Sequence, residues 1–283
     1  MSALPGEATT PGTPDHPTHK EHAMTAATHS PGSTMAPGPT TAHRRMDPMR
    51  RISLTAGVLY LVTFVSIPTL ALYKPVKDNV GTFVLGAGSD AGVLWGALSE
   101  VVVGLAGIGT AVVLYPVARR VSQTAALGFV TARVVETSLI FTGVVSMLTI
   151  FTLRTDVAGT AGANPASLVT TGHSLLASYT WTFLLSQSLM PVFCDLLLGY
   201  VLYRSRLVPR FLPIIAFVGA PLLLISDLAI FFGVYTNLSP IALFAGLPVA
   251  VFELTLGIWL IVKGFKPSKY GIDIAADLPV SGG

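Results

Sequence analysis

The residues most able to do chemistry in this sequence are polar side chains that lie inside long apolar segments. They are five carboxylic acids, one arginine and one glutamine: Glu100, Arg133, Glu136, Gln187, Asp195, Asp227 and Glu253. An ionisable group at the centre of a membrane-spanning helix costs roughly 2.5–3.5 kcal/mol on insertion scales, so such groups are functional candidates by default. Carboxylates in this setting bind cations or carry protons, and the seven residues form the candidate polar site.

Arg133 and Glu136 are the two candidates that are closest in sequence. Residues three positions apart lie on the same face of a helix, within reach of each other. The spacing therefore predicts an ion pair between them. Because the arginine side chain leans toward the start of its helix, Arg133 could also extend toward that membrane surface.

A proline shortly precedes the acid in each of the last three apolar segments: Pro191 before Asp195, Pro221 before Asp227 and Pro248 before Glu253. A proline inside a helix leaves the carbonyl four residues earlier without its N–H partner. Such carbonyls beside carboxylates hold cations or protons in the broken helices of transporters. The alternative is that the acids are structural and join helices through interhelical hydrogen bonds.

Other chemistries lack support in the sequence. It contains no H-E-x-x-H, G-x-S-x-G or phosphate-binding loop, which favours a protein without catalytic residues, although an acid–base enzyme using two carboxylates stays open. The single cysteine, Cys194, excludes an internal disulfide and a multi-cysteine metal site, and we expect it to be a small core residue. We expect no metal and no cofactor.

Apolar segments of membrane-spanning length position these residues. The chain has 283 residues, of which 52% are hydrophobic and 11% charged, whereas soluble proteins have about 25% charged residues. Blocks of about 20 apolar residues are typical of membrane-spanning helices. They predict an all-α polytopic membrane protein with six transmembrane helices, near 52–73, 91–115, 124–153, 179–203, 211–232 and 241–262. Residues 74–90 and 154–172 are expected to be loops.

The basic residues predict the orientation, because cytoplasmic loops are enriched in Lys and Arg. One side of the predicted membrane holds Arg44, Arg45, Arg50, Arg51, Arg119, Arg120, Arg204, Arg206, Arg210, Lys263, Lys266 and Lys269. The other side holds Lys74, Lys77 and Arg154. This asymmetry places the N-terminus and the C-terminus in the cytoplasm.

The composition divides the chain into three parts. Residues 1–45 are rich in Pro, Thr, Gly, Ser and Ala, which predicts a disordered tail whose histidines, such as His16, His19 and His22, are solvated and bind no metal. Residues 46–266 form the predicted six-helix membrane domain. Residues 267–283 are expected to be a short flexible cytoplasmic tail.

Four strings resemble a known bacterial family, domain of unknown function 4386. They are Arg51–Val65 (RISLTAGVLYLVTFV), Ala132–Glu136 (ARVVE), Leu198–Leu212 (LGYVLYRSRLVPRFL) and Glu253–Phe265 (ELTLGIWLIVKGF). The resemblance covers about residues 48–266. It implies a multi-span helical protein of the bacterial inner membrane and implies no activity.

The sequence therefore predicts a multi-pass protein of the bacterial cytoplasmic (inner) membrane, whose partner is the lipid bilayer. Its basic residues lie at the ends of the apolar segments, which indicates no nucleic-acid surface. Oligomeric state and substrate stay open. The favoured function is small-molecule or ion/proton-coupled transport through the intramembrane carboxylates. The alternative is a non-catalytic sensor or assembly partner with structural acids. Convergence of the carboxylates on one cavity would favour the first.

Overall fold

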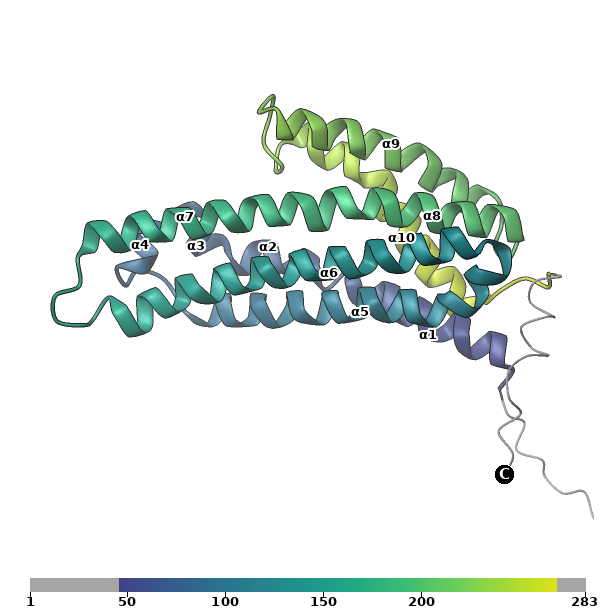
Figure 1. Cartoon of the computed structure of the whole chain (residues 1–283), viewed down its shortest axis with the longest axis horizontal. Coiled ribbons are helices and arrows are strands. Elements are labelled where there is room, and N and C mark those ends of the chain that lie inside the picture. Colours follow the sequence, from purple (N-terminus) through teal and green to yellow (C-terminus); the bar gives the residue numbers. More distant parts are fainter. Residues whose placement is uncertain (1–45, 269–283) are drawn as a thin grey trace, which may run out of the picture. The chain divides into compact units, whose positions relative to one another are not determined.

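The computed structural model describes residues 46–268, and in this part of the chain the secondary structure is helical, without a β-strand (Figure 1). Six of its helical segments are long and apolar enough to cross a membrane: Pro48–Thr69, Ala91–Val121, Gln123–Val157, Pro165–Ser205, Phe211–Phe231 and Pro240–Val262. The predicted all-α fold with six transmembrane helices is confirmed. Most of the predicted N-terminal and C-terminal tails lies outside the described residues.

The first span is broken into two helices, α1 (Pro48–Thr63) and α2 (Ser66–Leu72). The predicted loop after it contains two short helices, α3 (Lys74–Asp78) and α4 (Val80–Val84), so the loop prediction was wrong there. The reason is tertiary: Val80, Phe83 and Val84 are buried in a cluster with side chains from α6 and α7. Their burial stabilises helical turns that are too short to be stable alone.

Three long helical segments form the centre of the bundle: α5 (Ala91–Val121), α6 (Gln123–Thr152) with the π-helical turn η1 (Leu153–Val157), and a third segment of 41 residues. The third comprises α7 (Pro165–Leu184), the π-helical turn η2 (Leu185–Leu189) and α8 (Met190–Ser205). At about 1.5 Å per residue it is about 60 Å long, roughly twice the hydrocarbon thickness of a bilayer.

The start of α7 overturns the prediction of a loop over residues 154–172. The Asn164 side chain accepts a hydrogen bond from the Ala166 amide, and Pro165 occupies the first turn. A side-chain cap followed by proline is a favoured beginning of a helix. The helix therefore begins at Pro165, 14 residues before the predicted start of the span at residue 179.

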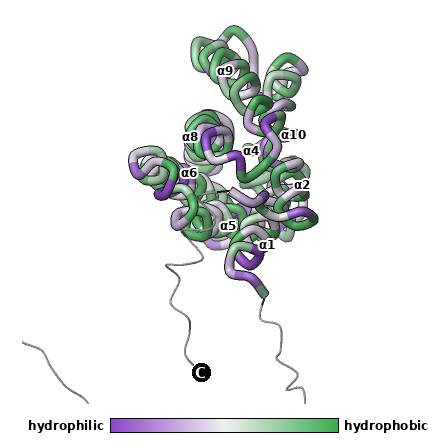
Figure 2. Tube along the Cα trace, turned by 90° about the vertical axis from the view of Figure 1, so that its right-hand side faces the viewer, coloured by the Kyte–Doolittle hydropathy of each residue, from purple (hydrophilic) through white to green (hydrophobic). Residues whose placement is uncertain are grey.

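The hairpin of α9 (Phe211–Phe231) and α10 (Pro240–Val262) packs on α8 and α1 (Figure 1). Its residues are largely hydrophobic (Figure 2), and many of its large hydrophobic side chains are exposed. Helix α10 approaches α1 closely, because a Cβ atom on Gly57 would lie 2.7 Å from the Gly257 carbonyl oxygen. With 21 and 23 residues, α9 and α10 are about 32 and 35 Å long, which matches one bilayer core.

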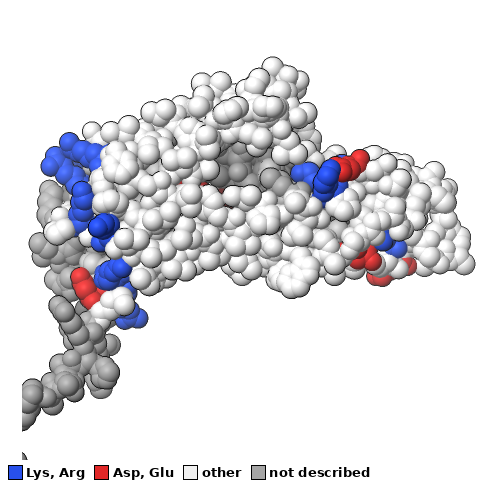
Figure 3. Space-filling view, turned by 180° about the vertical axis from the view of Figure 1, so that it is seen from behind, with Lys and Arg blue, Asp and Glu red and all other residues white. Residues whose placement is uncertain are grey.

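Basic side chains gather at the end of the bundle where α1 begins and α10 ends (Figure 3). Arg50 in α1 donates hydrogen bonds to the carbonyl oxygens of Leu260 and Ile261, which belong to the last turn of α10. These carbonyls have no partner within the helix, so the guanidinium satisfies them and joins the first and last spans.

Candidate functional site

Arg133 in α6 is the centre of a buried charged cluster. Its side chain is 2% exposed, and its Nη1 donates to both carboxylate oxygens of Glu136 at 3.0 Å. Its Nη2 donates to Glu253 Oε1 at 3.1 Å and to the Tyr60 hydroxyl at 3.5 Å. The predicted Arg133–Glu136 ion pair is confirmed. Arg133 stays inside the bundle and does not extend to a membrane surface.

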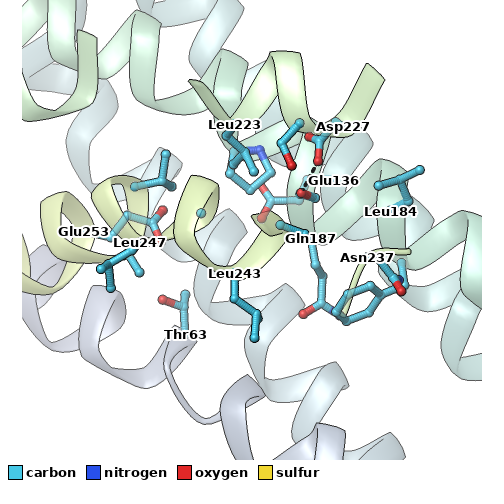
Figure 4. Close-up of a pocket in the computed structure, with 18 of the residues that line it drawn as sticks. Thr63, Glu136, Leu184, Gln187, Leu223, Asp227, Asn237, Leu243, Leu247 and Glu253 are labelled. Atoms are coloured by element: carbon cyan, nitrogen blue, oxygen red, sulfur yellow. Dashed lines mark hydrogen bonds between the residues drawn. The ribbon is translucent and has the colours of Figure 1, made fainter. Parts of the chain in front are cut away.

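The cluster faces a cavity of about 370 Å³ that lies among α1, α2, α6, η2, α9 and α10 (Figure 4). Five of the seven candidates line it: Arg133, Glu136, Gln187, Asp227 and Glu253. Thr63, Ser188, Ser226 and Asn237 add further polar groups. In the view of Figure 4, Glu253 and Asp227 lie on different sides of the cavity, with Glu136 and Gln187 between them.

The turn η2 directs two consecutive side chains toward different partners. Gln187 Nε2 donates to Glu100 Oε1 at 3.1 Å, and Ser188 Oγ donates to Asp227 Oδ1 at 2.5 Å. Pro191 follows this turn and, because it lacks an N–H, cannot donate to the ladder of backbone hydrogen bonds. π-Helical turns inside α-helices occur frequently at functional sites. Gln187 was predicted from the sequence as part of the polar site, and Pro191 as a proline that precedes an acid, whereas Ser188 was not predicted.

Glu100 lies outside the cavity lining, and its carboxylate accepts three hydrogen bonds. The hydroxyls of Tyr73 and Tyr179 donate to its carboxylate at 3.2 and 2.9 Å, in addition to Gln187. Gly96, one turn before Glu100, leaves space for the Tyr73 ring, since a Cβ there would lie 2.5 Å from Tyr73 Cε1. Neither tyrosine was predicted from the sequence as part of the site, because each lies near the end of its predicted span.

Lys77 in α3 lies beside this second cluster. Its ammonium group is 5.8 Å from the centre of the Tyr179 ring and 5.5 Å from that of Phe183, which lines the cavity. Burial lowers the pKa of Lys77, and the charge of Glu100 acts in the opposite direction. A cation is thus held close to the Glu100 cluster by two aromatic faces.

Asp195 is the candidate whose surroundings differ most from the others. Its side chain is fully buried in α8, it is absent from the cavity lining, and neither carboxyl oxygen has a hydrogen-bond partner. The charged groups that act on it are Glu253, Arg133 and Glu136. Burying a polar group without a hydrogen-bond partner is costly, so this carboxyl is held in place by packing alone.

The structure therefore brings five candidates together at one cavity and links Glu100 to them through Gln187, while Asp195 lies apart from the lining. Cys194, expected to be a core residue, is buried and donates to Glu136 Oε2 at 3.4 Å. Within residues 46–268, no group of three His, Cys, Asp or Glu side chains is placed to hold a metal ion.

Comparison with known protein families gives a match. The model of the family described as "Domain of unknown function (DUF4386)" matches residues 55–264. No curated protein and no solved structure matches the chain. The match confirms the resemblance seen in the four sequence strings and supports an integral, multi-pass membrane protein, without an activity.

Proposed function

We propose that this chain, which belongs to the DUF4386 family, is a transport-type protein that uses its intramembrane carboxylates to bind a small molecule or ion together with protons. We also propose that it lies in the bacterial cytoplasmic membrane with both termini in the cytoplasm. The basic end of the bundle supports this orientation, since Lys and Arg are enriched on the cytoplasmic side.

The observation that carries the proposal is the convergence of Glu136, Asp227 and Glu253 on one cavity. These acids come from three different helices, α6, α9 and α10. Acids that only join helices would be expected at separate packing interfaces with their oxygens paired. Here Oδ2 of Asp227 is buried without a partner, which leaves an acceptor for a proton or a ligand.

The helices around the cavity also have the interruptions that a change of access requires. The break between α1 and α2 and the π-helical turn η2 both lie beside it, since Thr63, Phe64, Gln187 and Ser188 belong to its lining. Sharp bends in helices occur at interruptions of this kind, whereas regular helices curve only gently. Broken helices next to a mid-membrane site are typical of transporters.

The surroundings of Glu100 indicate a structural acid. Structural acids are what the second candidate function, that of a sensor or assembly partner, would lead us to expect. Three neutral donors from two segments meet its carboxylate: Tyr73 between α2 and α3, and Tyr179 and Gln187 in the segment of α7 and η2. Such an arrangement satisfies the group in place and holds the segments together. We therefore assign the transport role to the cavity acids and a structural role to Glu100.

The test is a pH jump applied to purified protein in proteoliposomes on a solid-supported membrane. We expect a protein-dependent transient current from proton binding, reduced about tenfold by Glu253→Gln or Asp227→Asn, since each variant removes a proton site that faces the cavity. Asp156→Asn, which alters an exposed acid outside the cavity, is the matched control. The proposal fails if folded wild-type protein gives no current, or if the three variants respond alike.

A further inference from the structure

We propose that the cavity binds an amphipathic organic cation, a molecule with an ammonium-type head and an apolar body, and that this ligand enters sideways from the lipid. The inference rests on the proposed function, because it takes the cavity to be the site of the transported molecule. It is argued from three properties of the cavity: its charge, its apolar wall and the place of its rim.

The charge of the lining is unbalanced. It holds three carboxylates, those of Glu136, Asp227 and Glu253, and one guanidinium, that of Arg133. The guanidinium is already engaged by Glu136 and Glu253, while Asp227 has only the neutral Ser188 as a partner. A cation between Asp227 and Glu253 would therefore complete the site, whereas an anion would meet repulsion.

The remaining lining provides room for an apolar body. Leu223, Ile230, Leu243, Leu247 and Val249 lie on the α9 and α10 side of the cavity, and Phe64 and Ile67 lie on the α1 and α2 side. Figure 4 shows Leu243 and Leu247 on the border of the same space as Glu253. A volume of about 370 Å³ lies within the range of pockets for small organic molecules.

The rim of the cavity is apolar. Ile67, Leu243 and Leu247 belong to the lining and are yet 61%, 59% and 54% exposed, so they lie where the cavity opens. Leu243 and Leu247 are one to two turns inside the first residue of α10, a helix of bilayer length. The opening is therefore bordered by acyl chains, and Figure 3 shows a hollow in this face of the molecule with acidic atoms within it.

The charge of the lining, together with its apolar wall and rim, argues against two other classes of ligand. A hydrated inorganic cation would have to lose its water against an apolar rim, and the described acids do not form a metal-binding group. A neutral acyl chain would leave the Asp227 carboxylate with no cation beside it and only the neutral Ser188 as a partner. An amine with an apolar body places its charged head beside the carboxylates and its body against the apolar lining, and it can cross the apolar rim.

The experiment measures binding of a matched series to the full chain in lipid nanodiscs: 4-phenylbutylamine, its trimethylammonium analogue, 4-phenylbutanol and 4-phenylbutyrate. The apolar body is constant and the head changes from cation to neutral to anion. We expect the two cations to bind at least about tenfold more tightly than the alcohol, and the carboxylate most weakly. Empty nanodiscs correct for partitioning into the lipid.

Variants connect the preference to the cavity. Asp227→Asn and Glu253→Gln should each lower the affinity for the amine about tenfold and leave that for the alcohol unchanged, which a loss of folding would not do. Leu247→Trp should slow association by narrowing the opening. Ile258→Trp, a lipid-facing change three turns further along α10, is its matched control.

Equal affinities for amine and alcohol, or unchanged amine affinity in both acid variants, overturn the inference. Proton currents without a preference for the amine overturn the ligand class and leave the proposed function in place. Charge-dependent binding in a protein that gives no proton current has the opposite meaning: the ligand class stands and proton-coupled transport does not. Equal association rates in the two tryptophan variants overturn the lateral entrance.

Discussion

At the scale of the residue, the Arg133 side chain distinguishes two kinds of buried acid. Glu136 and Glu253 are both bound by its guanidinium, which places one positive charge beside the two carboxylates. Asp195 has no hydrogen-bond partner at either oxygen. Removing one partner from a buried ion pair is costly because the other charge is left alone, whereas removing an unpaired carboxyl leaves no such charge.

Asp195→Asn should therefore leave the fold intact. We expect its melting temperature to lie within about 4 °C of wild type, which corresponds to about 1 kcal/mol for a chain of this size. Arg133→Met, the contrasting variant, should lose about 3–5 kcal/mol, since Glu136 and Glu253 lose their cation. Thermal unfolding of both in the same detergent makes the comparison, and a large loss in Asp195→Asn with none in Arg133→Met would contradict this description.

The same residues show what the sequence could predict. The Arg133–Glu136 pair follows from local spacing, because three positions always bring two side chains to one helical face. The contact of Glu253 with Arg133 depends on the depth and rotation of α10 relative to α6. No local sequence pattern specifies either of these. The roles of Tyr73 and Tyr179 at Glu100 likewise depend on how α5 packs against distant segments.

At the scale of the element, glycines allow helices to pack closely enough to bring the site residues together. Gly57 on α1 faces the backbone of Gly257 on α10, and a Cβ there would also lie 2.8 Å from the Ile261 side chain. Small residues at helix contacts are a general means of association within membranes. This contact places Tyr60 of α1 and Glu253 of α10 within reach of the same nitrogen of Arg133, Nη2.

Gly57→Leu should separate α1 from α10 and weaken the Arg133 cluster. We expect a loss of stability of at least about 2 kcal/mol, because the new side chain meets backbone atoms that cannot move aside. Gly246→Leu, on the part of α10 where only the tip of a Leu223 side chain lies within 4 Å, is the control. The two variants are compared by thermal unfolding, and equal stability of both would argue against this contact.

The predicted elements were correct where a span is uniformly apolar and wrong where polar residues belong to a helix. Residues 165–178 are rich in Ser and Thr, and the sequence predicted a loop up to residue 172 and a span only from residue 179. In the structure the hydroxyls of Thr170, Thr171 and Ser174 donate to carbonyls four residues earlier in α7. These bonds satisfy the hydroxyls within the helix, so composition alone does not reveal its beginning.

At the scale of the whole molecule, the six spans differ in length. The hairpin of α9 and α10 matches one bilayer, whereas the segment from α7 to α8 is about twice as long as the hydrocarbon core is thick. Part of this segment therefore lies outside the hydrocarbon. Since α8 ends beside the basic end of the bundle, we expect the excess, with the start of α7, on the opposite side of the membrane.

Cysteine labelling in intact cells tests this orientation. Thr160→Cys, between η1 and α7, should react with a membrane-impermeant maleimide added from outside, and Lys263→Cys, at the end of α10, only after permeabilisation. The native Cys194 is buried and provides the unlabelled background. Labelling of Lys263→Cys alone in intact cells would reverse the proposed topology.

The wide turn η2 has a geometric consequence for the long helix that contains it. A π-helical turn holds one extra residue, and moving it by one position rotates the residue that it passes by about 100° around the helix axis. Such a shift would turn Gln187 away from Glu100, or Ser188 away from Asp227, without unfolding any helix. The long helix from α7 to α8 could in this way change the side chain that it presents to the cavity by a shift of one residue, while both of its ends stay in place.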